Sequence, residues 1–252
     1  MSAPNPIAFT IFGIDVMWYG ILIALGIVLA TLITYRRAPR HGIPSDRVLD
    51  FIIVCVPVGV VGARLYYVAF NWEYYAGDLL RIINLRQGGL AIHGGLIFGL
   101  LAAVLLCRLW GYNPFNAMDT AVPAIALAHS IGRWGNFFNS EAHGGPTDLP
   151  WAILVNGELV HPTFLYESIW CFLLFLFLLY MDNRRKFTGQ ICLLYGVLYS
   201  VERFFVEGLR TDSLMIGPFR QAQLISAAIF VVCLAAYIVM YRRNKSKGRI
   251  FY

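Results

Sequence analysis

Charged residues are scarce in this chain. Asp, Glu, Lys and Arg make up 13% of its 252 residues, whereas hydrophobic residues make up 59%. The mean hydropathy is +0.65. So little charge over this length excludes an ordinary soluble domain, and it is typical of a protein with many membrane spans.

Several motifs are also absent. The sequence has no H-x-x-x-H or H-E-x-x-H, so we expect no metal site, and it has no G-x-S-x-G of a serine hydrolase. We expect no cofactor. No Lys or Arg precedes Arg36, so the first apolar segment lacks the charged start of a cleaved signal peptide and we expect it to be retained. The cysteines lack the paired short spacing of disulfide or zinc frameworks, and we interpret them as packing residues: Cys55, Cys107, Cys171, Cys192 and Cys233.

Seven segments approach the roughly 20 apolar residues that a membrane-spanning helix requires. They lie at about 15–35, 48–70, 90–110, 117–137, 163–181, 188–206 and 221–241. Between the fourth and fifth, residues 139–162 are too polar and too rich in Gly and Pro to cross a bilayer, and we expect them to form a small extracytoplasmic cap. The sequence therefore predicts an all-α polytopic fold in which residues 1–252 form one integral-membrane domain.

The distribution of Lys and Arg predicts the orientation. Thirteen of them fall in the loops after spans one, three and five and in the C-terminal tail, including Lys247 and Arg249. The opposite side holds four: Arg81, Arg86, Arg210 and Arg220. Because cytoplasmic loops carry the excess of basic residues, we expect the N-terminus outside and the C-terminus inside. Basic residues confined to short loops also argue against a nucleic-acid partner.

Three arginines remain at membrane depth: Arg64, Arg133 and Arg203. A charged side chain at the centre of a bilayer costs about 2.5–3.5 kcal/mol on an insertion scale, so each needs an anionic partner or a water-filled cavity. Arg64 could pair with Asp119, and Arg203 with Glu207 at a spacing of four residues. A phospholipid phosphate is the other candidate, since the planar guanidinium group matches phosphate oxygens in a bidentate way.

Helical spacing places other polar residues beside these arginines. Tyr199, Arg203, Glu207 and Arg210 follow one face of the sixth span toward its outer end, and Arg133 shares a face with Asn136. His93 is flanked by Gly94 and Gly95 at the outer end of the third span. It is either a packed histidine or a group that transfers protons near neutral pH. His129, His143 and His161 have weaker claims to such a role.

The motifs together resemble the bacterial prolipoprotein diacylglyceryl transferase family. The resemblance covers nearly the whole chain and rests most strongly on the run G-R-x-G-N-F-x-N-x-E from Gly132 to Glu141. The other matching motifs are W-Y-G at 18–20, G-x-R at 62–64, H-G-G at 93–95, H-P-x-x-L-Y-E at 161–167 and R-x-x-x-E-x-x-R at 203–210.

The resemblance implies an activity and a site. Members of this family transfer the diacylglyceryl group of phosphatidylglycerol to the lipobox cysteine of preprolipoproteins in the bacterial inner membrane, and they release glycerol phosphate. It implies His93 as the base, or in a structural role if nearby arginines activate the thiol, with Arg133 and Arg203 as phosphate clamps. Residues expected to bind substrate are Tyr19, Arg64, Arg133, Asn136, Asn139, Glu141, Gly144, Tyr199, Glu207 and Arg210. A lipid or small-anion transporter is the alternative that intramembrane arginines leave open.

Overall fold

The computed structural model describes residues 5–78, 80–85 and 88–246. Arg86, Lys247 and Arg249, which contributed to the predicted orientation, lie outside the described residues. The chain divides into two compact units, one of Met1–Ile33 with Met118–Tyr252 and the other of Thr34–Ala117. Each unit is described by itself below.

The fold is helical, as the composition predicted. Five helical segments of the described chain are long and apolar enough to cross a membrane. They are α1 (Trp18–Arg37) continued by the 3-10 turn η1 (Ala38–His41), α2 (Ser45–Phe70), α5 (Ile92–Leu109), α7 (Thr163–Asp182) and α9 (Gln221–Ser246). Helices α6 (Pro114–Phe138) and α8 (Gln190–Leu209) occupy the positions expected for the fourth and sixth spans. They carry the polar side chains of the candidate site, and their passage through the membrane stays a prediction.

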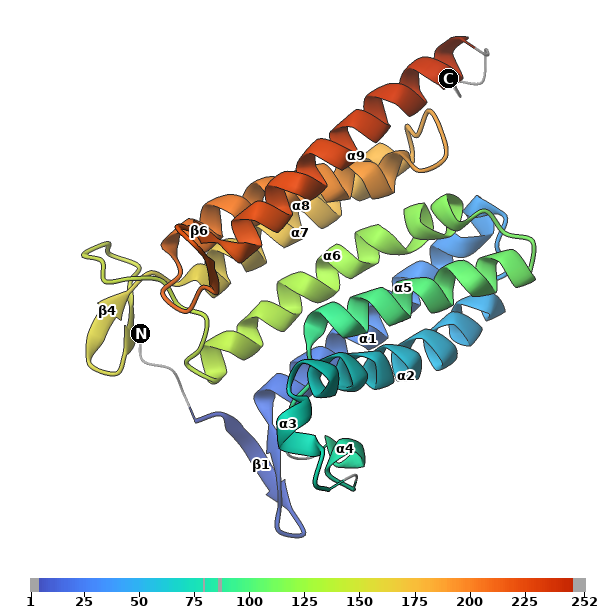
Figure 1. Ribbon diagram of the computed structural model, residues 1–252. Coiled ribbons are helices and arrows are strands. Elements are labelled where there is room, and N and C mark those ends of the chain that lie inside the picture. The colour runs from blue at the N-terminus through green and yellow to red at the C-terminus, as the bar shows by residue number, and fades with distance from the viewer. Residues whose placement is uncertain (1–4, 79, 86–87, 247–252) are drawn as a thin grey trace. The chain divides into compact units, whose positions relative to one another are not determined.

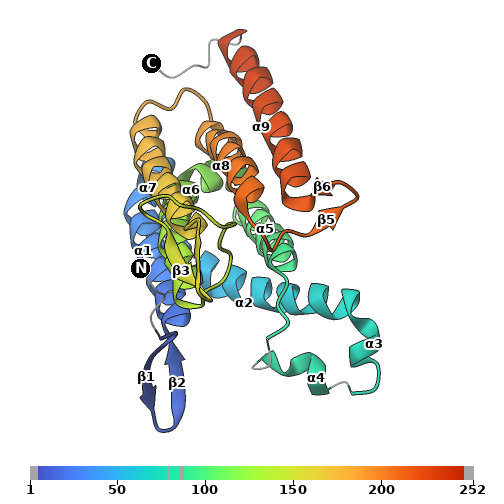
Figure 2. The same ribbon diagram turned by 90° about the vertical axis from the view of Figure 1, so that its left-hand side faces the viewer.

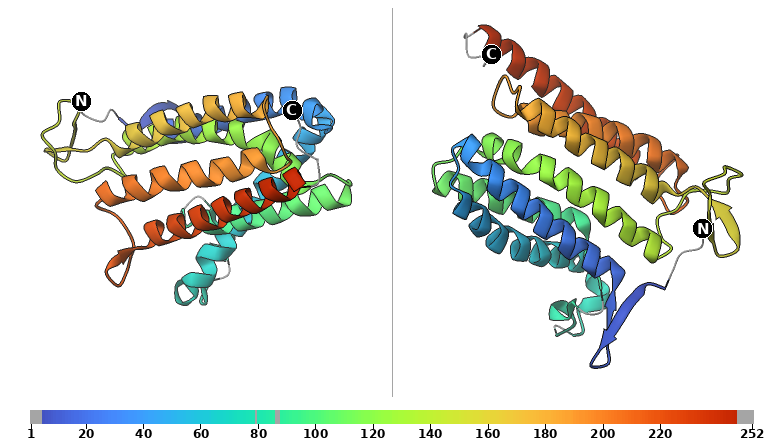
Figure 3. Two further views of the ribbon diagram at one scale, coloured as in Figure 1. Left: turned by 90° about the horizontal axis from the view of Figure 1, so that it is seen from above. Right: turned by 180° about the vertical axis from the view of Figure 1, so that it is seen from behind.

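Three helices build the core of the first unit. Helices α6, α7 and α8 bury a common apolar cluster made of Val122, Ala126, Leu174, Leu178 and Ile191. Helix α9 lies along α8, and a Cβ atom at Gly196 would come 2.5 Å from the sulfur of Cys233. Figure 1 shows α7, α8 and α9 side by side, and the left view of Figure 3 shows α8 in orange between α7 and α9. This packing places one face of α8 against α6 and α7.

Helix α1 packs on α6 within the same unit. A Cβ atom at Gly26 would lie 3.4 Å from Ala128, and the rings of Trp18 and Phe138 stack with centroids 5.1 Å apart. The start of α1 therefore lies next to the end of α6, where the G-R-x-G-N motif is located.

Short β-hairpins join or precede several helices. Strands β1 (Ile7–Ile11) and β2 (Ile14–Met17) pair around a turn in which Phe12 and Gly13 have positive φ angles (Figure 2). The expected first span therefore begins too early at residue 15, because Ile14–Met17 are held in a strand. Strands β3 (Ile153–Val155) and β4 (Glu158–Val160) form a hairpin in the 139–162 segment, and β5 (Met215–Ile216) and β6 (Phe219–Arg220) form one between α8 and α9.

Close packing of α2 on α5 organises the second unit. A Cβ atom at Gly62 would lie 2.3 Å from Cβ of Phe98, and one at Gly94 would lie 2.4 Å from the carbonyl oxygen of Gly62. Only glycine allows so close an approach at these two positions, as expected for small residues at helix interfaces. The segment between the two helices contains the short helices α3 (Trp72–Tyr75) and α4 (Leu80–Ile83).

Candidate active site

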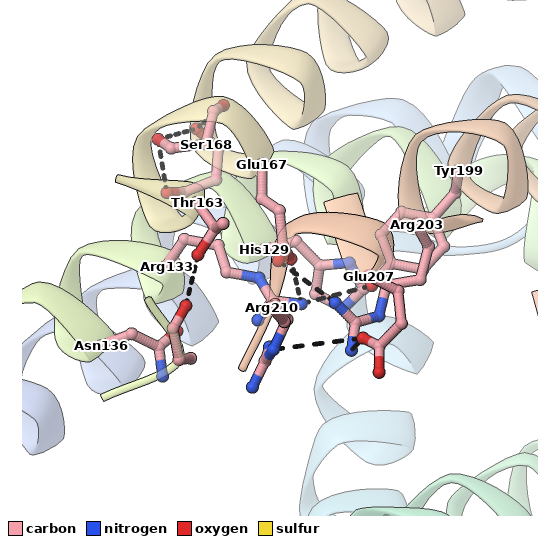
Figure 4. Close-up of polar contacts among 12 residues, drawn as sticks. His129, Arg133, Asn136, Thr163, Glu167, Ser168, Tyr199, Arg203, Glu207 and Arg210 are labelled. Carbon is pink, nitrogen blue, oxygen red and sulfur yellow. Dashed lines mark hydrogen bonds and ion pairs between the residues drawn. The ribbon is translucent and has the colours of Figure 1, made fainter. Parts of the chain in front are cut away.

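A buried carboxylate joins two of the three arginines that were expected at membrane depth. Glu167 lies in the second turn of α7 and its side chain is 1% exposed. One oxygen lies 2.5 Å from Nη2 of Arg133, on α6, and the other lies 3.3 Å from Nη1 of Arg203, on α8. Figure 4 shows Glu167 between the two guanidinium groups. Three separate helices therefore converge on one ion-pair cluster.

The cluster continues along the C-terminal part of α8. Nη2 of Arg203 lies 2.7 Å from Glu207, at the spacing of four residues that the sequence suggested. That predicted pairing is confirmed. Glu207 also lies 4.0 Å from Arg210, which holds both oxygens of Asp212 at 2.7 and 2.9 Å. Arg203 thus has two carboxylate partners, and the pairs continue to the end of the helix.

Two tyrosines of α8, N-terminal to Arg203, and a histidine of α6 pack together beside Arg133. The hydroxyl of Tyr199 accepts a hydrogen bond of 3.5 Å from Nη2 of Arg133. Tyr195 lies one turn earlier, stacks on Tyr199 and forms a hydrogen bond of 2.8 Å with Nδ1 of His129. His129 therefore belongs to the packing around the cluster, in agreement with its weaker claim to a catalytic role.

The signature run forms the end of α6 and the turn that follows it, and its own side chains hold this turn. Asn136 and Asn139 donate hydrogen bonds of 3.0 and 3.4 Å to the same oxygen of Glu141. Ser140 and Ala142 adopt positive φ angles, which let the chain reverse direction here. The expected group of Asn136, Asn139 and Glu141 is thus brought together, with the glutamate as common acceptor.

Gly144 fastens this loop to the ends of two other helices. Its amide donates to the carbonyl oxygen of His161, just before α7, while Gly145 donates to the carbonyl oxygen of Leu209 at the end of α8. A Cβ atom at Gly144 would lie 2.6 Å from Cβ of His161 and 3.1 Å from the carbonyl oxygen of Leu209. Glycine is therefore required at this position because protein backbone lies so close.

Tyr19 contacts the same region from α1. Its ring lies over Gly135, where a Cβ atom would come 2.2 Å from Cδ2 of the ring. The tyrosine is 38% exposed, so the ring both packs on α6 and keeps a free edge. Tyr19 on α1 therefore packs on α6 two residues after Arg133, whose guanidinium group contacts Tyr199 on α8.

Arg64 lies in the second unit and has a different set of partners. Its guanidinium group donates hydrogen bonds of 2.5–3.0 Å to five backbone carbonyl oxygens, those of Arg81, Ile82, Asn84, Gly88 and Gly89. These bonds engage all five N–H groups, so none is left for a phosphate in this structure. The suggested pairing with Asp119 is wrong, because backbone carbonyls satisfy Arg64 while Asp119 accepts from the amides of Gly189 and Cys192.

His93 is the second residue of α5, also in the second unit. Its side chain is exposed, and its ring centroid lies 6.3 Å from that of Tyr66 on α2. The following residue, Gly94, is buried against Gly62, which explains why the histidine is followed by glycine. The imidazole is therefore open to a bound group.

Two buried glutamates were not among the predicted site residues. Glu167 is the last residue of the H-P-x-x-L-Y-E motif and the only acid in α7 before Asp182. A single acid in an otherwise apolar helix was the sequence signal that could have indicated a site residue. Glu202 is 5% exposed on α8, and within the described chain neither of its oxygens has a hydrogen-bond partner. In the sequence Glu202 directly precedes Arg203, and nothing there indicated that its carboxyl group is buried without a hydrogen-bond partner.

Comparison with known proteins identifies the family. Residues 6–239 match the family described as prolipoprotein diacylglyceryl transferase. The chain belongs to this family. It is 52% identical over 240 residues to phosphatidylglycerol–prolipoprotein diacylglyceryl transferase of Clostridioides difficile (strain 630), covering 95% of this chain and 97% of that protein. The proteins of the same name from Finegoldia magna and Clostridium novyi (strain NT) are 51% and 45% identical, over 89% and 96% of this chain and 91% and 98% of theirs.

Proposed function

We propose that this membrane transferase moves the diacylglyceryl group of phosphatidylglycerol onto the cysteine thiol of a prolipoprotein. Support comes from relatives of that name that match along nearly their whole length. The single structural observation that carries the proposal is the cluster of Arg133 and Arg203 around one buried carboxylate. Arginines that remain partly accessible within an apolar chain suit an anionic lipid head group.

Both arginines have donors to spare. Among the described residues, Nε and Nη1 of Arg133 and Nε of Arg203 have no partner, while the remaining nitrogens contact Glu167, Tyr199 and Glu207. The two side chains are 23% and 19% exposed. A phosphate can therefore bind to the spare donors while Glu167 keeps both guanidinium groups in position.

This arrangement serves the charge that develops in the reaction. The thiolate sulfur forms a bond to the glyceryl carbon as the bond from that carbon to the phosphate oxygen breaks. The electron pair of the broken bond remains on the departing glycerol phosphate. Fixed guanidinium groups stabilise that charge in a water-poor site, an effect that typically supplies several kcal/mol. Arg133 and Arg203 fill this role in the proposed reaction.

The remaining assignments follow the same scheme. His93 accepts the thiol proton, a role that its exposed imidazole suits. Tyr19 and Tyr199 border the phosphate site through Gly135 and Arg133, respectively. Asn136 at the end of α6 and Asn139 in the following loop are held by Glu141, and this loop, anchored at Gly144, shapes the site. Glu207 holds Arg203 from the end of α8 and is itself contacted by Arg210.

We further propose the surroundings of the reaction. The protein lies in the bacterial inner membrane with its N-terminus outside and its C-terminus in the cytoplasm, which places the 139–162 segment outside. Its peptide partner is the signal peptide of a preprolipoprotein with a lipobox cysteine. The excess of basic residues in the loops after spans one, three and five supports this orientation.

Purified protein tests the proposal with phosphatidylglycerol and a lipobox peptide. The wild type adds a diacylglyceryl group to the peptide and releases glycerol phosphate, whereas Arg133→Ala and Arg203→Ala lose both products. Arg108→Ala, an exposed arginine at the end of α5, is the matched control and retains them. A lipid or anion transporter would leave the lipid intact, so absence of glycerol phosphate from the wild type would refute the transferase assignment.

A further inference from the structure

Glu202 differs from every other acid of the cluster because it is buried without a partner. Its side chain is 5% exposed, and among the described residues no donor reaches either oxygen. Glu167 and Glu207 each contact an arginine at 3.3 Å or less. A buried carboxylate with no hydrogen bond is strongly disfavoured, whereas the neutral acid is tolerated far better.

Arg133 is the arginine of the cluster with the most spare donors, and it lies next to Tyr199 on α8. Glu202 follows Tyr199 by one helical turn on α8, and the hydroxyl of Tyr199 contacts Nη2 of Arg133. Arg133 and Arg203 both act electrostatically on Glu202, as does Glu167. The spare donors of Arg133 would then serve either a phosphate or the Glu202 carboxylate.

We propose that Glu202 is a positioning residue, held as a neutral acid beside Arg133, and that its ionisation closes the anion site by capturing the spare donors of Arg133. This inference rests on the proposed phosphate site. As a neutral group Glu202 leaves Arg133 to the head group. Deprotonation in alkaline solution turns Glu202 into a competitor of the phosphate.

The effect of Glu202 must be separated from that of the other titratable and charged groups on α8 and on the elements packed against it. They are His129 and Arg133 on α6, Glu167 and Cys171 on α7, Tyr195, Tyr199, Arg203 and Glu207 on α8, Arg220 on β6 and Cys233 on α9. Cys171 is the closest counterpart, since it is fully buried in the same cluster and can also lose a proton in alkaline solution. Cys171→Ser is therefore the matched control.

Binding of short-chain phosphatidylglycerol, measured by titration calorimetry on the full-length protein in detergent, tests the proposal. The phosphodiester keeps one charge throughout the alkaline range, so its own titration does not interfere. In the wild type and in Cys171→Ser, the affinity for the lipid falls about tenfold for each pH unit once Glu202 is ionised in the free protein. The reason is that Glu202 must then take up one proton before the lipid binds. In Glu202→Gln, affinity does not change with pH over that range.

Glu202→Met serves as a second variant, because it also lacks the proton and keeps a similar volume. If either variant folds, as judged by a cooperative melting transition, it must show the flat profile. A falling affinity in both variants would overturn the role of Glu202. Absence of phosphatidylglycerol binding by the wild type at neutral pH would instead refute the phosphate site itself, so the two failures are distinguishable.

Discussion

Replacing Glu167 by Gln removes the charge that holds Arg133 and Arg203 together while keeping the size of the side chain. Glu167 is 1% exposed, whereas the two arginines are 23% and 19% exposed and Arg203 keeps Glu207. Water and the remaining acid therefore compensate part of the loss. We expect a cost of about 3 kcal/mol, the lower end for breaking a buried ion pair.

The assay is thermal unfolding in detergent. At about 2–4 °C per kcal/mol for a chain of this size, the variant should melt about 6–12 °C below the wild type. Glu158→Gln is the matched control, since Glu158 is exposed on β4. In a double-mutant cycle, Glu167→Gln should cost less when Arg133 is already Gln, because the unpaired guanidinium group is then absent. Equal melting temperatures for Glu167→Gln and Glu158→Gln would refute the description of Glu167 as the central acid.

Three further substitutions test other contacts. Gly135→Ala places a Cβ atom 2.2 Å from the Tyr19 ring, so we expect a lower melting temperature and reduced transfer; Gly132→Ala, whose Cβ atom would lie 3.5 Å from Ile23, is the milder comparison. Arg64→Lys gives up most of the five carbonyl hydrogen bonds and should destabilise the protein by more than about 1 kcal/mol; an unchanged melting temperature would contradict a structural role. Arg210 holds the pKa of Asp212 below its usual range through a hydrogen bond, so the pair stabilises the fold above the unfolded pKa and loses this effect as pH falls through the folded pKa. Asp212 is 49% exposed, so Asp212→Asn should remove less than about 1 kcal/mol of the stability that is lost in acid. If the melting temperature of the variant falls with decreasing pH as steeply as that of the wild type, the pair does not contribute.

The apolar segments made the helices predictable. Their length and composition gave the positions of the long helices to within a few residues, because hydrocarbon imposes a minimum number of apolar residues on a membrane-spanning helix. The β1–β2 hairpin was not recognised, since Ile14, Val16 and Met17 are apolar and continue directly into α1. The polar stretch 139–162 indicated a break in the membrane segments but not the hairpin within it.

The site was predictable only where local spacing carried the information. Arg203 and Glu207 lie four residues apart on one helix, and their contact follows from helical geometry. Glu167 and Arg133 lie on different helices, and their pairing depends on how α6 and α7 pack. The carbonyl groups around Arg64 could not be anticipated, because backbone acceptors are present at every residue and leave no trace in the sequence.

The central claim is that Arg133 and Arg203 bind the phosphate of the lipid substrate. An experimental structure with bound phosphatidylglycerol tests it most directly. We predict phosphate oxygens within hydrogen-bonding distance of both guanidinium groups, with Glu167 still contacting each of them from the buried side. A phosphate bound away from both arginines, with their spare donors still unoccupied, would contradict the account.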